Sequence, residues 1–185
     1  MDNGASSYRR FLQGDENGIV EIIRDYKDGL ILYLNSLTQN VCIAEELMEE
    51  TFLKLLVIKP RYSARYSFKT WLYTIGRNTA IDHLRRNARS VHMTAEEMQS
   101  ILNEEESLEQ SYIREEEKIA IHRAMSQLNV KYRQVLYLMF FEDLSTEQAA
   151  AVMKKSKRQI ANLSYRAKLS LKAQLDKEGF VYEGL

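Results

Sequence analysis

The chain has 185 residues, a formal net charge of zero and one cysteine, and 45% of its residues are hydrophobic. One proline and seven glycines, set against abundant helix-forming residues, predict an all-α fold of one or two small domains. The single cysteine excludes an intramolecular disulfide. The N-terminus lacks the apolar stretch of a signal peptide, and the longest apolar run, Val135 to Phe141, is too short to cross a bilayer. These features indicate a cytoplasmic protein without direct insertion into a membrane.

The zero net charge hides a strong asymmetry along the chain. Between Asn87 and Glu117, nine acidic residues accompany only two basic ones, whereas Lys118 to Leu185 carries 12 basic and six acidic residues. The part before Asn87 is nearly neutral. A basic C-terminal part of this kind indicates a nucleic-acid partner.

A first helical block extends from about Asp15 to Arg86. Apolar residues recur at helical spacing from Ile19 to Tyr33, and a second helix is predicted from about Val41 to Val57, after a break near residues 37–40. Pro60 ends that helix. A basic and aromatic loop, KPRYSARYS, then leads to a third helix that begins near residue 68 and continues to the end of the block.

The pattern weakens from Asn87 to Arg114, which is rich in glutamate and poor in core-type residues, and this segment is predicted to be a linker. A second helical block begins near Glu115. It contains one helix with apolar residues up to Leu128 and a very apolar one from Tyr132 to Phe141.

The segment from Ser145 to Lys168 predicts a helix-turn-helix, two short helices joined by a tight basic turn. Ser145 with Gln148, and Ser156 with Gln159, each fit a capping box, so each helix has a start signal of its own.

The second helix of this motif would bury one apolar stripe and expose a basic face. The buried stripe is predicted to contain Ile160, Leu163, Ala167, Leu171 and Leu175. The exposed residues that can reach base edges in a major groove are Lys157, Arg158 and Asn162. Those that suit phosphates are Lys155, Tyr165, Arg166 and Lys168.

An enzymatic site has no support in the sequence. The three histidines, His83, His92 and His122, lie in different segments without the spacing of metal ligands. No glycine-rich phosphate loop occurs, and the carboxylates stand in runs on polar faces or in the linker. We therefore expect no catalytic residues, no metal and no cofactor, and the chain is not expected to be an enzyme.

Two segments together resemble the extracytoplasmic-function (ECF) group of bacterial RNA polymerase sigma factors. AEELMEETFLKLL and FKTWLYTIGRNTAIDHLRR, at residues 44–56 and 68–86, resemble region two of that family. Residues 128–175, which contain the helix-turn-helix, resemble region four. The resemblance implies a region-two-like domain at residues 1–86, a flexible acidic linker at 87–114 and a region-four-like domain at 115–185.

Family membership would make the chain an alternative sigma factor that binds core RNA polymerase and directs promoter-specific initiation of transcription. The implied partners are the clamp helices of the polymerase's largest subunit, its flap, promoter DNA and an anti-sigma factor that could hold the protein at a membrane. The residues that would dock on the clamp helices are Glu46, Glu49, Glu50 and Phe52.

The resemblance also assigns the downstream (−10) promoter element to the basic and aromatic loop and the helix after it. Unstacked bases need aromatic or polar pockets, and the DNA backbone needs cations. The groups offered here are Arg61, Tyr62, Arg65, Tyr66, Phe68 and Lys69. By family analogy Asn78 would hold a flipped base, phosphates would be contacted by Arg77, Arg85 and Arg86, and Trp71 is expected to pack in the core.

The chain departs from the family pattern at the helix-turn-helix. Lys154 stands where the family usually has glycine in the turn, and lysine disfavours a left-handed backbone, so we expect the turn to differ locally. Asn129 replaces a proline that usually follows Leu128.

Two other functions remain open from the sequence. One is a DNA-binding repressor or activator that acts alone as a dimer, and the other is an interaction module that does not bind DNA. A simple regulator would show a ligand pocket or a dimer seam in its N-terminal block, and an interaction module would not need the basic helix.

Overall fold

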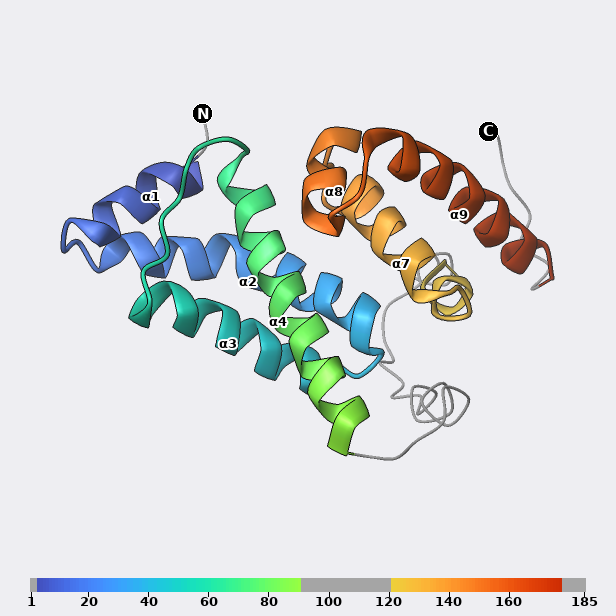
Figure 1. Ribbon diagram of the computed structural model, residues 1–185, viewed down its shortest axis with the longest axis horizontal. Coiled ribbons are helices and arrows are strands. Elements are labelled where there is room, and N and C mark those ends of the chain that lie inside the picture. Colours follow the sequence, from blue (N-terminus) through green and yellow to red (C-terminus); the bar gives the residue numbers. More distant parts are fainter. Residues whose placement is uncertain (1–2, 91–120, 178–185) are drawn as a thin grey trace, which may run out of the picture.

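The computed structural model describes residues 3–90 and 121–177, and every regular element within these ranges is helical, which confirms the all-α fold. The first domain contains α1 (Asn3–Leu12), α2 (Asn17–Thr38), α3 (Val41–Val57) and α4 (Phe68–Ser90). The second contains a helical segment at residues 121–126, then α7 (Val130–Leu136), the π-helix η2 (Tyr137–Phe141), α8 (Thr146–Met153) and α9 (Lys157–Lys177). Figure 1 shows the two domains side by side, with α1 and α9 at opposite ends.

The predicted linker lies mostly outside the described residues. Its first four residues belong to α4, which continues to Ser90. The rest of the linker, and the start of the helix expected after it, fall in the part that the structure does not describe.

α2 forms the centre of the first domain, where α1, α3 and α4 all pack against it. Leu30 and Leu34 of α2 are completely buried, as are Leu55 of α3 and Leu72 of α4. Burying such side chains contributes about 2 kcal/mol each, which holds the bundle together. Asn40 caps α3 by accepting a hydrogen bond from the Ile43 amide, so this helix begins and ends where the sequence predicts.

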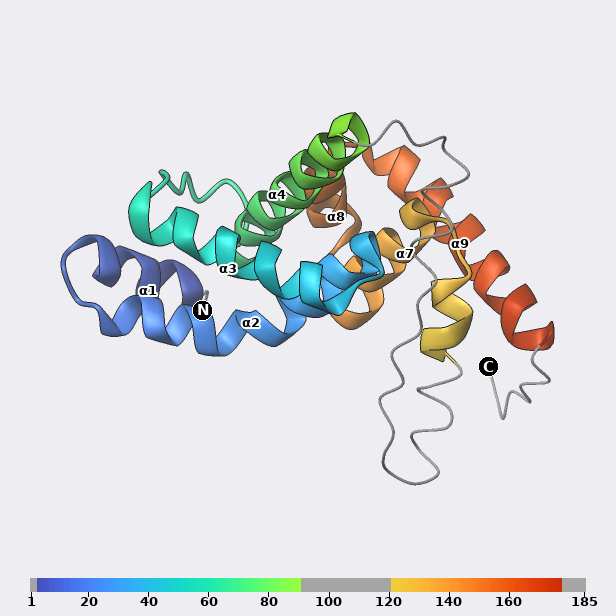
Figure 2. The same cartoon turned by 90° about the horizontal axis from the view of Figure 1, so that it is seen from below.

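The first helix, α1, was not predicted. The sequence places the first helix near residue 15, yet α1 buries Tyr8 and Phe11 against α2 and α4. Both views of the molecule show α1 lying along α2 (Figures 1 and 2).

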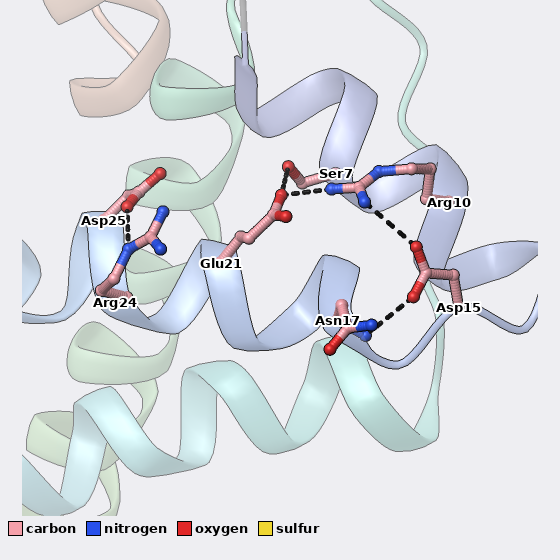
Figure 3. A network of polar contacts seen from close by, with 7 residues as sticks. All are labelled: Ser7, Arg10, Asp15, Asn17, Glu21, Arg24 and Asp25. Carbon is pink, nitrogen blue, oxygen red and sulfur yellow. Dashed lines mark hydrogen bonds and ion pairs between the residues drawn. The ribbon is translucent and has the colours of Figure 1, made fainter.

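Polar contacts fasten α1 to α2, as Figure 3 shows. The Ser7 hydroxyl donates to Glu21 at 2.6 Å, and the Arg10 guanidinium pairs with both Glu21 and Asp15. Gly18 allows the close approach of the two helices, since a Cβ there would lie 2.2 Å from the Ser7 carbonyl oxygen.

In the second domain both predicted capping boxes are present. Ser145 and Gln148 bond reciprocally at the start of α8. The Ser156 amide donates to Gln159 and the Gln159 amide to Ser156, at 2.9 and 3.2 Å. Asn129, which stands in place of the family's proline, caps α7. Its side chain accepts hydrogen bonds from the backbone amides of Lys131 and Tyr132.

The prediction that Lys154 makes the turn of the helix-turn-helix differ locally is wrong. Lys154 adopts the left-handed conformation, with φ 53° and ψ 49°, and its amide donates to the carbonyls of Ala150 and Ala151 at the end of α8. These hydrogen bonds hold a lysine in a conformation that glycine takes more readily.

Candidate nucleic-acid interface

The N-terminal half of α9 presents a basic face to solvent. The exposed side chains there include all but one of the helix-turn-helix residues predicted to contact DNA: Lys157, Arg158, Asn162, Tyr165, Arg166 and Lys168. Lys155, in the turn, is half-buried. Ile160 and Ala167 are buried as predicted, whereas Leu163 and Leu171 are only partly buried and Ser164 is buried in addition.

Two of these exposed residues are held by contacts within the domain. The ammonium of Lys157 pairs with Glu147 of α8, and that of Lys168 lies 4.5 Å from the ring centre of Phe140. Such exposed ion pairs are weak, so a DNA phosphate or base can replace Glu147 at small cost.

The loop at residues 59–67, called here the aromatic–basic loop, forms a cavity of about 150 Å³ with α4. Its walls include Tyr62, Tyr66 and Trp71, and Ala151 of α8 closes one side. The Tyr62 hydroxyl donates to the Tyr66 carbonyl at 2.6 Å, which keeps the loop folded over the cavity. Arg61 and Arg65 are exposed in the same loop, next to Tyr62 and Tyr66 in the chain, and the Arg65 guanidinium lies 5.6 Å from the ring centre of Tyr66.

Phe68 does not belong to this surface, contrary to the sequence prediction. Its side chain is completely buried, and its ring packs 5.3–5.7 Å, between centroids, from the rings of Tyr8, Tyr26, Tyr62 and Trp71. A side chain without solvent access cannot stack on a base, so Phe68 supports the cavity from behind. Trp71 is partly buried in the same cluster, as expected.

Phe52 is likewise a core residue and cannot be the apolar anchor on the polymerase. It is 4% exposed on α3, whereas the next residue, Leu53, is 54% exposed. Glu49 and Glu46 are exposed and lie on the same face, one and two turns before Leu53 respectively. Glu50 is half-buried and pairs with Lys54 at 2.9 Å.

Lys69 and Arg77, which are predicted to contact DNA, bind the second domain in this structure. The Lys69 ammonium lies 2.8 Å from a carboxylate oxygen of Glu142 and also donates to its carbonyl. The Arg77 Nε donates to the Gln134 side chain at 3.2 Å. Asn78 is half-buried next to Arg77, while Arg85 and Arg86 are exposed near the end of α4.

Glu142 is the centre of the contact between the domains. Its side chain is 10% exposed and accepts a hydrogen bond from Tyr73. Burial, and then the charge of Glu142, raise the pKa of Tyr73 far above its ordinary value, so the phenol remains a donor. Gly29 leaves the space for both groups, because a Cβ there would lie within 2.7 Å of each.

Further hydrogen bonds join the domains through side chains of α7 and α8. The Arg133 Nε donates to the Ser36 carbonyl, near the end of α2, at 2.9 Å. Burial lowers the pKa of Arg133 to about 10, which still leaves it charged at neutral pH. The Gln148 amide nitrogen donates to Ser67 at 3.1 Å.

The sequence carried no signal for Arg133 or Glu142, because their partners lie 97 and 73 residues away. Among the described residues no group of three or more histidine, cysteine, aspartate or glutamate side chains could hold a metal. No helix in residues 3–90 or 121–177 is long and apolar enough to span a membrane.

Comparison with known protein families identifies both domains. Residues 22–90 match the model of sigma-70 region 2, and residues 118–171 match that of sigma-70 region 4. α1 lies outside both matches.

Similar proteins carry the same description. The chain is 27% identical to the ECF RNA polymerase sigma factor SigM of Bacillus subtilis, over 84% of this chain and 93% of that protein. It is 30% identical to the ECF sigma factor BldN of Streptomyces coelicolor, over 83% of this chain and 59% of that protein. Its fold is similar to that of the sigma factor RpoE, solved in complex with the anti-sigma factor NepR from Bartonella quintana, with a TM-score of 0.68 and 22% identity over 84% of this chain and 95% of the other.

Proposed function

Since this chain belongs to the ECF group of bacterial RNA polymerase sigma factors, we propose that its two domains read the two elements of one promoter. A member of this group binds core RNA polymerase and directs initiation at chosen promoters. The observation that carries the proposal is the pair of basic surfaces, one on each domain: the exposed face of α9, and the aromatic–basic loop with its cavity.

The second domain reads the upstream (−35) element. Its exposed helix α9 begins at a capped N-terminus, where Lys157 and Arg158 stand in the first turn. A helix entering the major groove with such residues first can contact base edges through Arg158 and Asn162. Tyr165, Arg166 and Lys168 then contact the backbone, which adds affinity without sequence preference.

The first domain opens and holds the downstream (−10) element. A flipped base needs a pocket with an aromatic wall, and the cavity beneath Tyr62 and Tyr66 offers one. Arg61 and Arg65 supply the charge for the backbone beside it. Asn78, Arg85 and Arg86 continue this surface along α4.

α3 docks on the clamp helices of core polymerase. Because Phe52 is buried, the exposed Leu53 is the apolar anchor of this surface, and Glu46 and Glu49 lie beside it on the same face of α3. Acidic residues around an apolar anchor suit a basic coiled-coil partner.

Promoter binding requires the two domains to separate. Lys69 and Arg77 are engaged by Glu142 and Gln134, and Ala151 of α8 borders the cavity. Downstream DNA therefore competes with the second domain for the same side chains. We assign residues 1–86 to the downstream element and polymerase, 87–114 to the linker and 115–185 to the upstream element.

We place the protein in the cytoplasm, where RNA polymerase acts, and assign it no enzymatic activity of its own. An anti-sigma factor is its proposed inhibitor, and the sigma factor RpoE, which has a similar fold, forms a complex with the anti-sigma factor NepR. Such a partner would hold the sigma factor away from polymerase until a signal releases it.

A binding experiment separates this function from that of a regulator acting alone. Promoter fragments are mixed with the protein alone, with core polymerase alone, and with both. We expect specific retention only with both, because in the free protein the second domain engages Lys69 and Arg77 and so blocks the downstream surface of the first domain. Tight, specific binding of duplex DNA by the protein alone, unchanged by polymerase, would support the solitary regulator instead.

A further inference from the structure

α1 packs against the first residues of the aromatic–basic loop. This helix lies outside the region that matches the sigma-70 family model. The Tyr8 hydroxyl donates to the Pro60 carbonyl at 2.8 Å, across 52 residues of sequence. The Lys59 ammonium lies 5.0 Å from the ring centre of Phe11. Two residues of α1 therefore hold the first two residues of the loop.

The loop needs such support because its backbone is strained. Lys59 and Ala64 have φ values of 47° and 55°, in the left-handed region that residues with a side chain seldom adopt. Conformations of this kind persist only where surrounding contacts impose them. Lys59 stands at the start of the loop, directly beside the contacts that α1 makes.

The ring of Tyr8 also supports the cavity. It is 1% exposed and packs 5.2 Å from Trp71 and 5.6 Å from Phe68, between ring centres. Trp71 is itself part of the cavity wall. Tyr8 thus contacts the loop through its hydroxyl and the base of the cavity through its ring.

We propose that α1 is a positioning element for promoter opening, and that Tyr8 sets the loop in the conformation that captures the displaced base. The proposal rests on the assignment of the downstream element to this loop. Tyr8 is buried and does not contact DNA itself; it acts through Pro60 and Trp71. Burial raises the pKa of Tyr8 to about 12, so the hydroxyl remains a donor throughout the physiological pH range.

The test compares Tyr8→Phe with Tyr33→Phe in complete holoenzyme. Both variants lose one hydroxyl from a buried ring, but the Tyr33 hydroxyl has no hydrogen-bond partner, and its ring packs 5.4 Å from that of Tyr73 on α4. The template is the strongest promoter mapped by run-off transcription of the encoding genome with wild-type holoenzyme. Three quantities are measured: the thermal unfolding midpoint, the affinity for core polymerase, and the rate at which downstream thymines become reactive to permanganate.

We expect Tyr8→Phe to slow opening by about five-fold, the factor for one hydrogen bond of ordinary net strength, with polymerase affinity equal to that of Tyr33→Phe. Gly18→Ala, whose Cβ would lie 2.8 Å from the Phe11 amide and so displaces α1, should slow opening further. Opening at the wild-type rate in Tyr8→Phe would overturn the proposal, and so would a parallel loss of polymerase affinity. If wild-type holoenzyme itself opens no promoter, the proposed function fails rather than the role of α1.

Discussion

The ammonium of Lys69 and the carboxylate of Glu142 lie 2.8 Å apart and join α4 of the first domain to the residue that follows η2 in the second. The carboxylate is largely buried, so removing the lysine leaves it without its cation. We expect Lys69→Met to weaken the contact between the domains by about 1.5–3 kcal/mol, the range for a hydrogen bond to a charged group.

Small-angle X-ray scattering of the free protein measures this weakening as a larger radius of gyration. The control is Lys131→Met, because Lys131 is exposed on α7. A radius of gyration equal to that of the wild type in Lys69→Met would show that the pair does not keep the domains together.

Substitutions at the neighbouring residues Phe52 and Leu53 should affect different properties, the first stability and the second polymerase binding. Phe52→Ala empties a core site and should lower the free energy of unfolding by about 3–5 kcal/mol. Leu53→Ala changes an exposed side chain and should alter stability by less than about 0.5 kcal/mol, while reducing affinity for core polymerase. Urea unfolding and a polymerase-binding titration measure the two effects, and unchanged affinity in Leu53→Ala would remove this residue from the docking surface.

Replacing Lys154, the left-handed residue of the turn, by glycine should stabilise the second domain. Glycine at 154 relieves the unfavourable conformation of Lys154, at some cost in entropy of the unfolded chain, for a net gain of about 0.5–1 kcal/mol. Lys155→Gly is the matched control, because its φ is not positive. Equal or lower stability of Lys154→Gly in urea unfolding would mean that the lysine is not strained.

Arg158 should determine sequence preference at the upstream element. If it makes a bidentate base contact, Arg158→Ala should weaken binding of that element by about 1–3 kcal/mol. Lys177→Ala, at the far end of α9, should leave holoenzyme binding unchanged. Competition with unrelated DNA measures the preference, and an equal loss on both DNAs would make Arg158 a phosphate contact.

The packing of α1 on α2 should weaken at acid pH, because Glu21 becomes protonated. The Ser7 hydrogen bond, and then Arg10, hold the pKa of Glu21 below its ordinary 4.5. Because the pKa is lower in the folded state, ionised Glu21 stabilises the fold above about pH 4.5, and this stabilisation disappears as the pH falls through the lowered value. Glu21→Gln removes the titrating group at similar size.

Fluorescence of Trp71, the only tryptophan, measures this effect because its ring packs on Tyr8. We expect the unfolding free energy of the wild type to decrease more steeply below pH 4.5 than that of Glu21→Gln. Parallel pH profiles would show that Glu21 does not couple α1 to acid stability.

The sequence predicted the elements whose signals are local. The boundaries of α3 follow from the break near residues 37–40 and from Pro60, and both capping boxes of the helix-turn-helix appear as expected. The exposed face of α9 follows from its helical period. In contrast, α1 is only ten residues long and offers one turn of apolar pattern, Tyr8 and Phe11, which is too short to distinguish from chance.

Aromatic residues and contacts between the domains could not be assigned in this way. Composition makes Phe52 and Phe68 equally suitable for a partner or for a core, and only their burial in the folded domain decides. For Phe68 the neighbouring rings are those of Tyr8, Tyr26 and Trp71. The ion pair between Lys69 and Glu142 joins distant segments without any repeating pattern. It also explains why a predicted DNA contact is occupied within the protein itself.

Directed initiation of transcription is the activity that distinguishes a sigma factor from other DNA-binding proteins. Core polymerase and supercoiled DNA carrying the mapped promoter are incubated with and without the protein, and the 5′ ends of the transcripts are determined. We predict a defined start site that appears only when the protein is present and that is lost in the double variant Asn78→Ala, Arg158→Ala. Transcripts that are the same with and without the protein, despite its binding to the DNA, would show that the protein does not act as a sigma factor.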